Sequence, residues 1–464
     1  MPPPSSFVNA DTGNPNRESA TVRNPPTREA KGRSKLLRRG HTLSYLGLFL
    51  FTLVLFFRPY ELFESLSSLS SLAYWLAIAT LLIFLPTQFA LEGNLTTRPR
   101  EVNLLLLLCV AGLLSIPLAI NLKEAWDTFN DTFFKAVLMF IVMINVVRTE
   151  RRLVRIIHLS LGVTLLLSVN AISDYRSGNF AVEGYRIKGL LGGMFGNPND
   201  LALHLVTMVP LAVVLLIRTR NLLGKIGYGA CAVLIVAANV VTYSRGGFLG
   251  LLATMVVLVW KLGRSNRISV AIFGPICLAL FIALAPGGYG LRILSIFVPG
   301  LDPNGSSSSR QAILDRSVLV SLRNPMVGIG MGNFHIVSYR ETVSHNAYTQ
   351  VSAEMGIAAL VIYIMFIIAP LKRLRRIERE TYEMRRHSTF YYLAVGLQAS
   401  LVGYMVSSFF ASVAYQWYIY YLIGYAVCIR RMYETEQMAI GETAATKELL
   451  VENDLRDEGR AVAY

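Results

Sequence analysis

The segment "LALHLVTMVPLAVVLLI", residues 201–217, decides the fold class of this chain. Its 17 residues include no Asp, Glu, Lys or Arg. A helix of about 17–25 apolar residues is long enough to cross the hydrocarbon core of a bilayer, which is about 30 Å thick. Backbone N–H and C=O groups find no partners in lipid, so a segment that crosses it must satisfy them internally. The segment therefore predicts a transmembrane helix.

Similar apolar blocks recur along the whole chain. Hydrophobic residues make up 53% of the sequence and charged residues only 16%. The predicted spans are 41–57, 71–90, 103–121, 133–148, 153–171, 201–217, 226–243, 247–260, 268–285, 350–370, 388–408 and 413–429. We therefore predict an all-α fold, a polytopic transmembrane helix bundle of about 12 spans with one large, partly helical periplasmic loop. All four cysteines fall in these spans, which is typical of small core residues.

The charge distribution predicts the orientation. Residues 1–40 contain eight Lys or Arg and no long apolar run, which indicates a disordered basic cytoplasmic tail. If the spans alternate from there, the inner segments hold 32 Lys/Arg against 17 Asp/Glu, and the outer segments 12 against 12. The net charge of +15 thus follows the positive-inside pattern and does not indicate a nucleic-acid partner. We predict a membrane domain over 41–429, a cytoplasmic tail over 430–464, and both termini in the cytoplasm, with membrane lipids as neighbours.

The long loops lie on the predicted outer face. They cover residues 172–200 and 286–349, whereas the inner loops are short and basic. Long loops in compact proteins are usually functional or disordered. The inner loops contain no Gly-rich phosphate cradle and no pair of aspartates spaced to hold a nucleotide sugar through a metal. The sequence therefore predicts that the working face is the outer one.

One charged residue interrupts two spans in "VVTYSRGGFLGLL", residues 240–252. We expect Arg245 in a tight outer turn, because a charge in hydrocarbon costs from about 3 to more than 10 kcal/mol. Gly246 and Gly247 would supply the backbone conformations of such a turn and allow a ligand to approach closely. The alternative is an interfacial arginine that reaches the lipid headgroups.

Other polar residues gather on the same face. In loop 172–200, Arg186 and a run of glycines are candidates for an anion-facing rim, and Asn199 or Asp200 for the cap of the next span. In the larger loop, "RQAILDRSVLVSL" has helical spacing and would place Arg310 in a first helical turn. "NPMVGIGMGNF" predicts a backbone bend.

His345 and Asn346 stand immediately before the tenth predicted span, and Glu354 follows about two turns later. Histidine acts as a base near neutral pH, and nearby arginines would lower its pKa and keep it neutral. Glu354 would orient His345 or an arginine, or reach the interface. A plain surface histidine is the alternative. No metal site is predicted, because His335 and His345 lack ligand spacing with any carboxylate or thiolate.

Four motifs in order make the chain similar to a known family. "GNPNDLA" at 196–202, "SRGGFLG" at 244–250, "NPMVGIGMGNF" at 324–334 and "HNAYTQVSAEMGIAAL" at 345–360 resemble the O-antigen ligase and O-antigen polymerase family of bacterial envelopes. The resemblance covers roughly residues 180–370.

The resemblance implies a bacterial inner-membrane glycosyltransferase with a periplasmic active face. Its donor would be an undecaprenyl-diphosphate-linked glycan, its acceptor a hydroxyl of a lipid-linked or other glycan, and no metal or other cofactor would be needed. Arg245, Arg310 and His345 match the family's catalytic positions. The remaining candidates are expected to bind substrate; they are Arg186, Asn197, Asn199, Asn346 and Glu354.

Two other classes of function compete with this interpretation. A transporter or flippase of polysaccharides or lipid-linked glycans needs polar groups near the middle of the membrane, often on broken and repeated helices. The predicted spans are nearly free of charge away from their outer ends, and no internal repeat is apparent. A non-catalytic scaffold would not need arginines and a histidine on one face.

Overall fold

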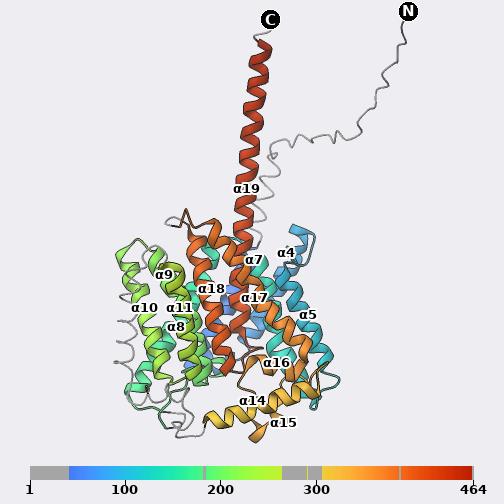
Figure 1. The fold of residues 1–464 in the computed structure, drawn as a ribbon, viewed down its shortest axis with the longest axis vertical. Helices are drawn as coiled ribbons and strands as arrows, with labels where there is room; N and C mark the ends of the chain where they lie inside the picture. The colour runs from blue at the N-terminus through green and yellow to red at the C-terminus, as the bar shows by residue number, and fades with distance from the viewer. Residues whose placement is uncertain (1–40, 181–183, 264–289, 291–305, 386–387, 462–464) are drawn as a thin grey trace, which may run out of the picture. The chain divides into compact units, whose positions relative to one another are not determined.

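The computed structural model describes residues 41–180, 184–263, 290, 306–385 and 388–461. Every regular element within these ranges is helical, so the predicted all-α class is confirmed. Nine helical segments in this part of the chain are long and apolar enough to cross a membrane. Figure 1 shows these helices side by side, as expected for a polytopic membrane bundle. The segments are Thr42–Leu62, Glu64–Glu92, Leu122–Val146, Glu150–Arg176, Pro198–Arg218, Leu222–Val241, Arg245–Leu262, Ile357–Glu380 and Thr389–Phe410.

Three other predicted spans have different outcomes. The one expected over 103–121 is the 16-residue helix α5 (Arg100–Ser115), which ends two residues before Pro117, a residue without the N–H that would continue the helix. The one expected over 268–285 lies outside the described residues. The last forms the first part of α19 (Trp417–Ala461), which continues as one helix into the residues assigned to the C-terminal tail.

The boundary predicted for the tenth span was wrong. Residues 350–370 were expected to be one helix, but α16 (Ala347–Met355) and α17 (Ile357–Glu380) are separate. Gly356 divides them with a φ of 91°, a conformation that residues with side chains rarely adopt. A Cβ atom at this glycine would lie 2.6 Å from the carbonyl carbon of Met326. Close contact with the Gly-rich bend therefore fixes where the span begins.

Helix α9 (Pro198–Arg218) is the most buried of the nine spans, because 78% of the residues in its most apolar 18-residue stretch are buried. It packs against α10 (Leu222–Val241), α11 (Arg245–Leu262) and α18 (Thr389–Ser407). A Cβ atom at Gly403 of α18 would lie 2.8 Å from Val206 Cγ1, so the glycine permits close helix contact. These helices form the support on which the site described below is built.

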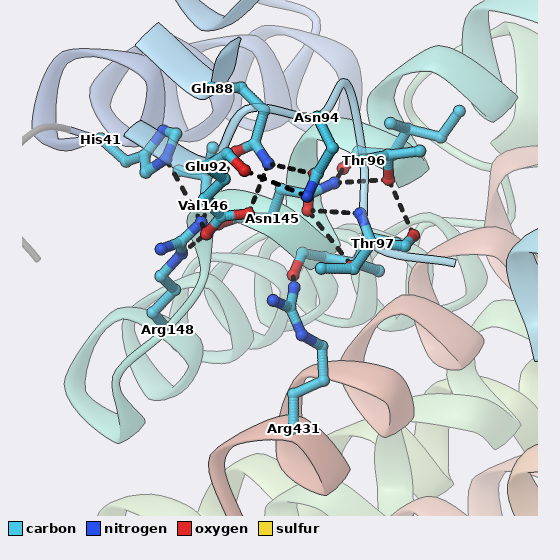
Figure 2. A network of polar contacts seen from close by, with 12 residues as sticks. His41, Gln88, Glu92, Asn94, Thr96, Thr97, Asn145, Val146, Arg148 and Arg431 are labelled. Carbon is cyan, nitrogen blue, oxygen red and sulfur yellow. Dashed lines mark hydrogen bonds and ion pairs between the residues drawn. The ribbon is translucent and has the colours of Figure 1, made fainter. Parts of the chain in front are cut away.

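A polar network secures the end of α4 (Leu72–Glu92), which belongs to the least buried of the nine membrane-spanning segments (Figure 2). Glu92 at its end forms an ion pair with Arg148, which also contacts His41 Nε2 at 3.3 Å. Burial, followed by the charge of Arg148, lowers the pKa of His41 to about 4, so this ring is neutral at pH 7. Beside it, Asn145 Nδ2 donates to Thr96 Oγ1 at 2.8 Å. The network thus holds the end of a helix that otherwise packs chiefly against α2 (Thr42–Phe57).

Candidate functional site

Arg245 is the first residue of α11 and follows a tight turn. α10 ends at Val241, and Tyr243 adopts a left-handed backbone conformation with φ 53°. The Ser244 hydroxyl caps α11 by accepting a hydrogen bond from the Gly247 N–H at 3.1 Å. Arg245 is only 8% exposed, and a cation at the start of a helix is disfavoured by the helix dipole. The turn between the two spans is therefore present. A bound anion would stabilise the positive charge of Arg245 at this helix start.

The expectation that the two glycines of this motif supply the backbone conformations of the turn was wrong. Gly246 and Gly247 belong to the first turn of α11, and Tyr243 makes the bend instead. A Cβ atom at Gly246 would lie 2.6 Å from Phe410 Cβ, and one at Gly247 would lie 2.6 Å from Ala202 Cβ. The glycines therefore allow the start of α11 to press closely against its neighbours.

Arg186 holds this turn through hydrogen bonds. It is 3% exposed, and its Nε donates to the Thr242 carbonyl at 3.1 Å. Its Nη2 donates to Asn199 Oδ1 at 2.9 Å, and the Ser244 hydroxyl donates to the same oxygen at 3.0 Å. The cap of α9 is Asn197, whose side chain accepts the Asn199 N–H at 2.8 Å, and not Asn199 or Asp200 as expected. Arg186 and Asn199 therefore hold the backbone that carries Arg245.

Arg310 lies on α14 (Ser306–Arg323), the helix predicted within the large loop. It is the fifth described residue of that helix, about one turn later than expected. α14 packs against α16 (Figure 1), and the Ser321 and Ser352 hydroxyls are 2.8 Å apart between them. A small apolar core completes the contact; its buried members are Ile313, Val320, Ile329, Phe334 and Ala353. Arg310 therefore stands on a packed element.

His345 has a strained backbone conformation directly before α16. Its φ is 51°, in the left-handed region that non-glycine residues rarely adopt. Its N–H donates to Ser412 Oγ at 2.8 Å, which helps to hold this conformation. Asn346 caps α16 by accepting hydrogen bonds from the N–H groups of Tyr348 and Thr349 at 2.9 and 3.1 Å. Strain of this kind, held by its surroundings, is common at functional sites.

One pocket of about 370 Å³ brings four of the predicted site residues together. These are Arg245, Arg310, His345 and Asn346, although they are distant in sequence. The remaining lining residues are Leu249, Gln311, Leu314, Ser344, Phe409 and Phe410. The sequence analysis did not predict most of them. The aromatic pair in "SSFFASVAYQW" directly follows the predicted span 388–408, and this position at the membrane surface could have indicated a place in the site. The pocket therefore combines cationic, basic and apolar groups.

The environment of His345 keeps its imidazole neutral. Burial, followed by the positive charge of Arg310, lowers the pKa of His345 from 6.5 to about 4. The expected direction of the pKa shift is thus found, and the contribution of Arg310 with it, but burial is the larger cause. The negative charge of a bound anion would oppose the effect of Arg310 and favour a higher pKa.

Glu354 lies away from the pocket, behind the Gly-rich bend. It is 3% exposed, and its Oε1 accepts the Phe334 N–H at 3.3 Å, while its carbonyl accepts the Gly330 N–H at 3.0 Å. Gly330 has a φ of 97°. Burial raises the pKa of Glu354 to about 7. Glu354 contacts this bend and, through its side chain, Tyr415 and Gln350; among the described residues, neither His345 nor an arginine is one of its hydrogen-bond partners.

A second, mostly apolar cavity of about 510 Å³ adjoins the pocket. The two share Leu314, Asn346 and Phe409 as lining residues. Further along α14 the wall of this groove includes Val318, Leu319 and Leu322, which are 43%, 39% and 65% exposed. A charged pocket and an apolar groove therefore meet at one side of α14.

The described residues contain no group of three or more His, Cys, Asp or Glu side chains arranged to hold a metal ion. Residues 230–364 match the family model described as O-antigen ligase. The chain carries an O-antigen ligase domain. No curated protein matches the sequence.

The O-antigen ligase domain includes the three residues predicted to be catalytic. Arg245, Arg310 and His345 all fall inside the matched segment, whereas Arg186 precedes it and Phe410 follows it. This match and the nine membrane-spanning helices of the described residues support a multi-pass bacterial inner-membrane protein with a glycosyltransferase-like function in O-antigen assembly.

Proposed function

We propose that this protein transfers a glycan from an undecaprenyl-diphosphate carrier to an acceptor hydroxyl on the periplasmic face of the membrane, without a metal ion. The observation that carries the proposal is the pocket in which Arg245, Arg310 and His345 meet beside an apolar groove. An amphipathic donor needs both surfaces, because its diphosphate is anionic and its carrier is a hydrocarbon chain.

The two arginines supply the charge that a diphosphate requires. A lipid-linked diphosphate carries about two negative charges, and guanidinium groups bind phosphate oxygens through paired hydrogen bonds. When the glycosidic bond breaks, its electron pair stays on the diphosphate and negative charge grows there. Each fixed donor near such a charge commonly contributes about 3–4 kcal/mol to transition-state stability.

His345 is suited to receive the proton of the acceptor. The hydroxyl oxygen attacks the anomeric carbon, the bond from that carbon to the diphosphate breaks, and the hydroxyl proton passes to the neutral imidazole. A pKa of about 4 makes His345 a weak base in the empty pocket. The charge of the bound diphosphate would raise that pKa toward neutrality and strengthen the base when the donor is present.

The position of buried charges favours an enzyme over a transporter. In the described ranges, Glu101 is the second residue of α5 and pairs with Arg430 at 2.9 Å. Glu378 lies two residues before the end of α17 and pairs with Lys261 in the last turn of α11. The acidic member of each pair lies at a helix end, whereas a transporter needs charge near the middle of the membrane.

The orientation is part of the proposal. The inner segments carry the whole excess of Lys and Arg, which supports cytoplasmic termini and a periplasmic pocket.

Purified protein in nanodiscs, supplied with an undecaprenyl-diphosphate glycan and a set of acceptors, tests the proposal. Product glycan and released undecaprenyl diphosphate should appear together. Arg245→Lys and Arg310→Lys should each weaken transfer at least tenfold, because lysine offers a point charge and not a fork. Arg323→Lys, on the same helix as Arg310 but outside the pocket, is the matched control. Full activity in both pocket variants would reject the diphosphate site.

A further inference from the structure

A second charged pocket lies at the opposite end of the bundle from the site. It has a volume of about 250 Å³ and lies between the start of α5 and the later part of α17. α17 begins next to α16, and its 24 residues span about 36 Å. The pocket lies on the later part of this helix, away from α16. The lining residues are Arg100, Glu101, Ala369, Lys372, Arg373 and Arg376.

The pocket is strongly cationic. Four of its five charged lining residues are basic, and the fifth, Glu101, already accepts hydrogen bonds from Arg430 at 2.9 and 3.0 Å. Arg376 pairs with Glu380 at 2.7 Å. Within the part of the chain that the structure describes, Arg100, Lys372 and Arg373 form no ion pair. Three cations therefore surround a small cavity whose one lining acid, Glu101, is already paired with Arg430.

Both helices continue from this pocket as exposed apolar stripes. On α5, Leu107 and Leu114 follow Arg100 at intervals of seven residues and are 51% and 58% exposed. On α17, Met365 and Val361 precede Ala369 at intervals of four residues and are 37% and 51% exposed. A ligand with an anionic head and hydrocarbon tails matches a cationic pocket that opens onto two apolar stripes.

We propose that this pocket binds the headgroup of an anionic phospholipid, with its acyl chains along α5 and α17. The phosphate would lie among Arg100, Lys372 and Arg373, and the positive end of the α5 dipole adds to their attraction. The apolar stripes favour a lipid over a soluble phosphate, because a soluble ion would leave them unused. The site is independent of the proposed transferase pocket and would persist if that assignment failed.

Equilibrium binding of a fluorescent phosphatidylglycerol to the full chain in detergent, at 0.15 M salt, tests the site. The double variant Lys372→Gln/Arg373→Gln should bind the lipid about 10- to 30-fold more weakly, since each cation near a lipid headgroup contributes roughly fivefold. Arg100→Gln, on the other helix, should weaken binding about fivefold. Thermal unfolding of each variant confirms that the chain is folded.

The matched control is Arg375→Gln/Arg379→Gln, which removes two exposed charges from the same helix outside the pocket. Its affinity should stay within about threefold of the parent. Equal loss in both double variants would mean that the basic surface attracts lipid without a specific site, and the proposal would be overturned. Phosphatidylcholine should compete poorly. Glycerol phosphate that binds as tightly as the lipid would identify a site for soluble anions and would also overturn it.

Discussion

Replacement of Arg186 by lysine decides whether this residue binds substrate or positions Arg245. The arginine donates to the Thr242 carbonyl at 3.1 Å and to Asn199 at 2.9 Å, and it is 3% exposed. A lysine keeps the charge, but a single ammonium cannot reproduce the forked geometry that reaches both acceptors. Loss of one buried hydrogen bond from a charged donor costs about 1.5–3 kcal/mol.

The expected result of Arg186→Lys is therefore a loss of stability together with slower transfer. For a chain of 464 residues the loss lowers the melting temperature by about 1.5–3 °C. Intrinsic fluorescence during heating gives the melting temperature, and transfer and donor affinity are measured on the same sample. Lys188→Gln, two residues away and exposed, is the control and should change neither. An unchanged melting temperature with lost donor binding would refute the positioning role and make Arg186 a ligand.

The remaining predictions concern the base, the packing of the pocket and the topology. The pKa of His345 is lowered, so kcat/KM should be flat above about pH 5.5 and fall as acid protonates the ring near pH 4; this acid limb should vanish in His345→Ala, and an unchanged limb would assign it to another group. Gly246→Ala brings a Cβ to 2.6 Å from Phe410 Cβ and should slow transfer at least threefold, whereas Gly227→Ala, with open space around it, should have no effect; equal rates in both would show that the contact is unimportant. Tyr339→Cys should react with an impermeant thiol reagent from the periplasm and Arg379→Cys only from the cytoplasm, and the reverse pattern would invert the proposed topology.

The sequence predicted the elements of the fold better than their limits. Apolar runs such as 201–217 identify spans because hydrocarbon imposes the same requirement on every backbone group. The break at Gly356 was missed because "AEMGIAAL" is continuous in hydropathy, and only the approach of Met326 requires the interruption. Contacts between distant segments leave little trace in a local pattern.

The candidate site was predictable in part for a similar reason. Arg245, Arg310 and His345 stood out because they share the predicted outer face and match the family motifs, and they do line one pocket. Arg186 and Asn199 look the same in sequence, yet their hydrogen bonds face the turn beneath that pocket. Whether a polar side chain points into a cavity or into its support depends on packing, which residue type and spacing do not determine.

The contact between Gly246 and Phe410 also affects how the molecule is assembled during synthesis. Phe410 emerges from the ribosome 165 residues after Arg245. At translation rates of about 5–20 residues per second, the start of α11 waits roughly 8–33 s for this wall of its pocket. During that interval a cation at the membrane edge must be accommodated by headgroups or by the insertion machinery. The pocket is therefore among the last parts of the bundle to close, and a nascent chain that stops before α18 would leave Arg245 without the wall that Phe410 provides.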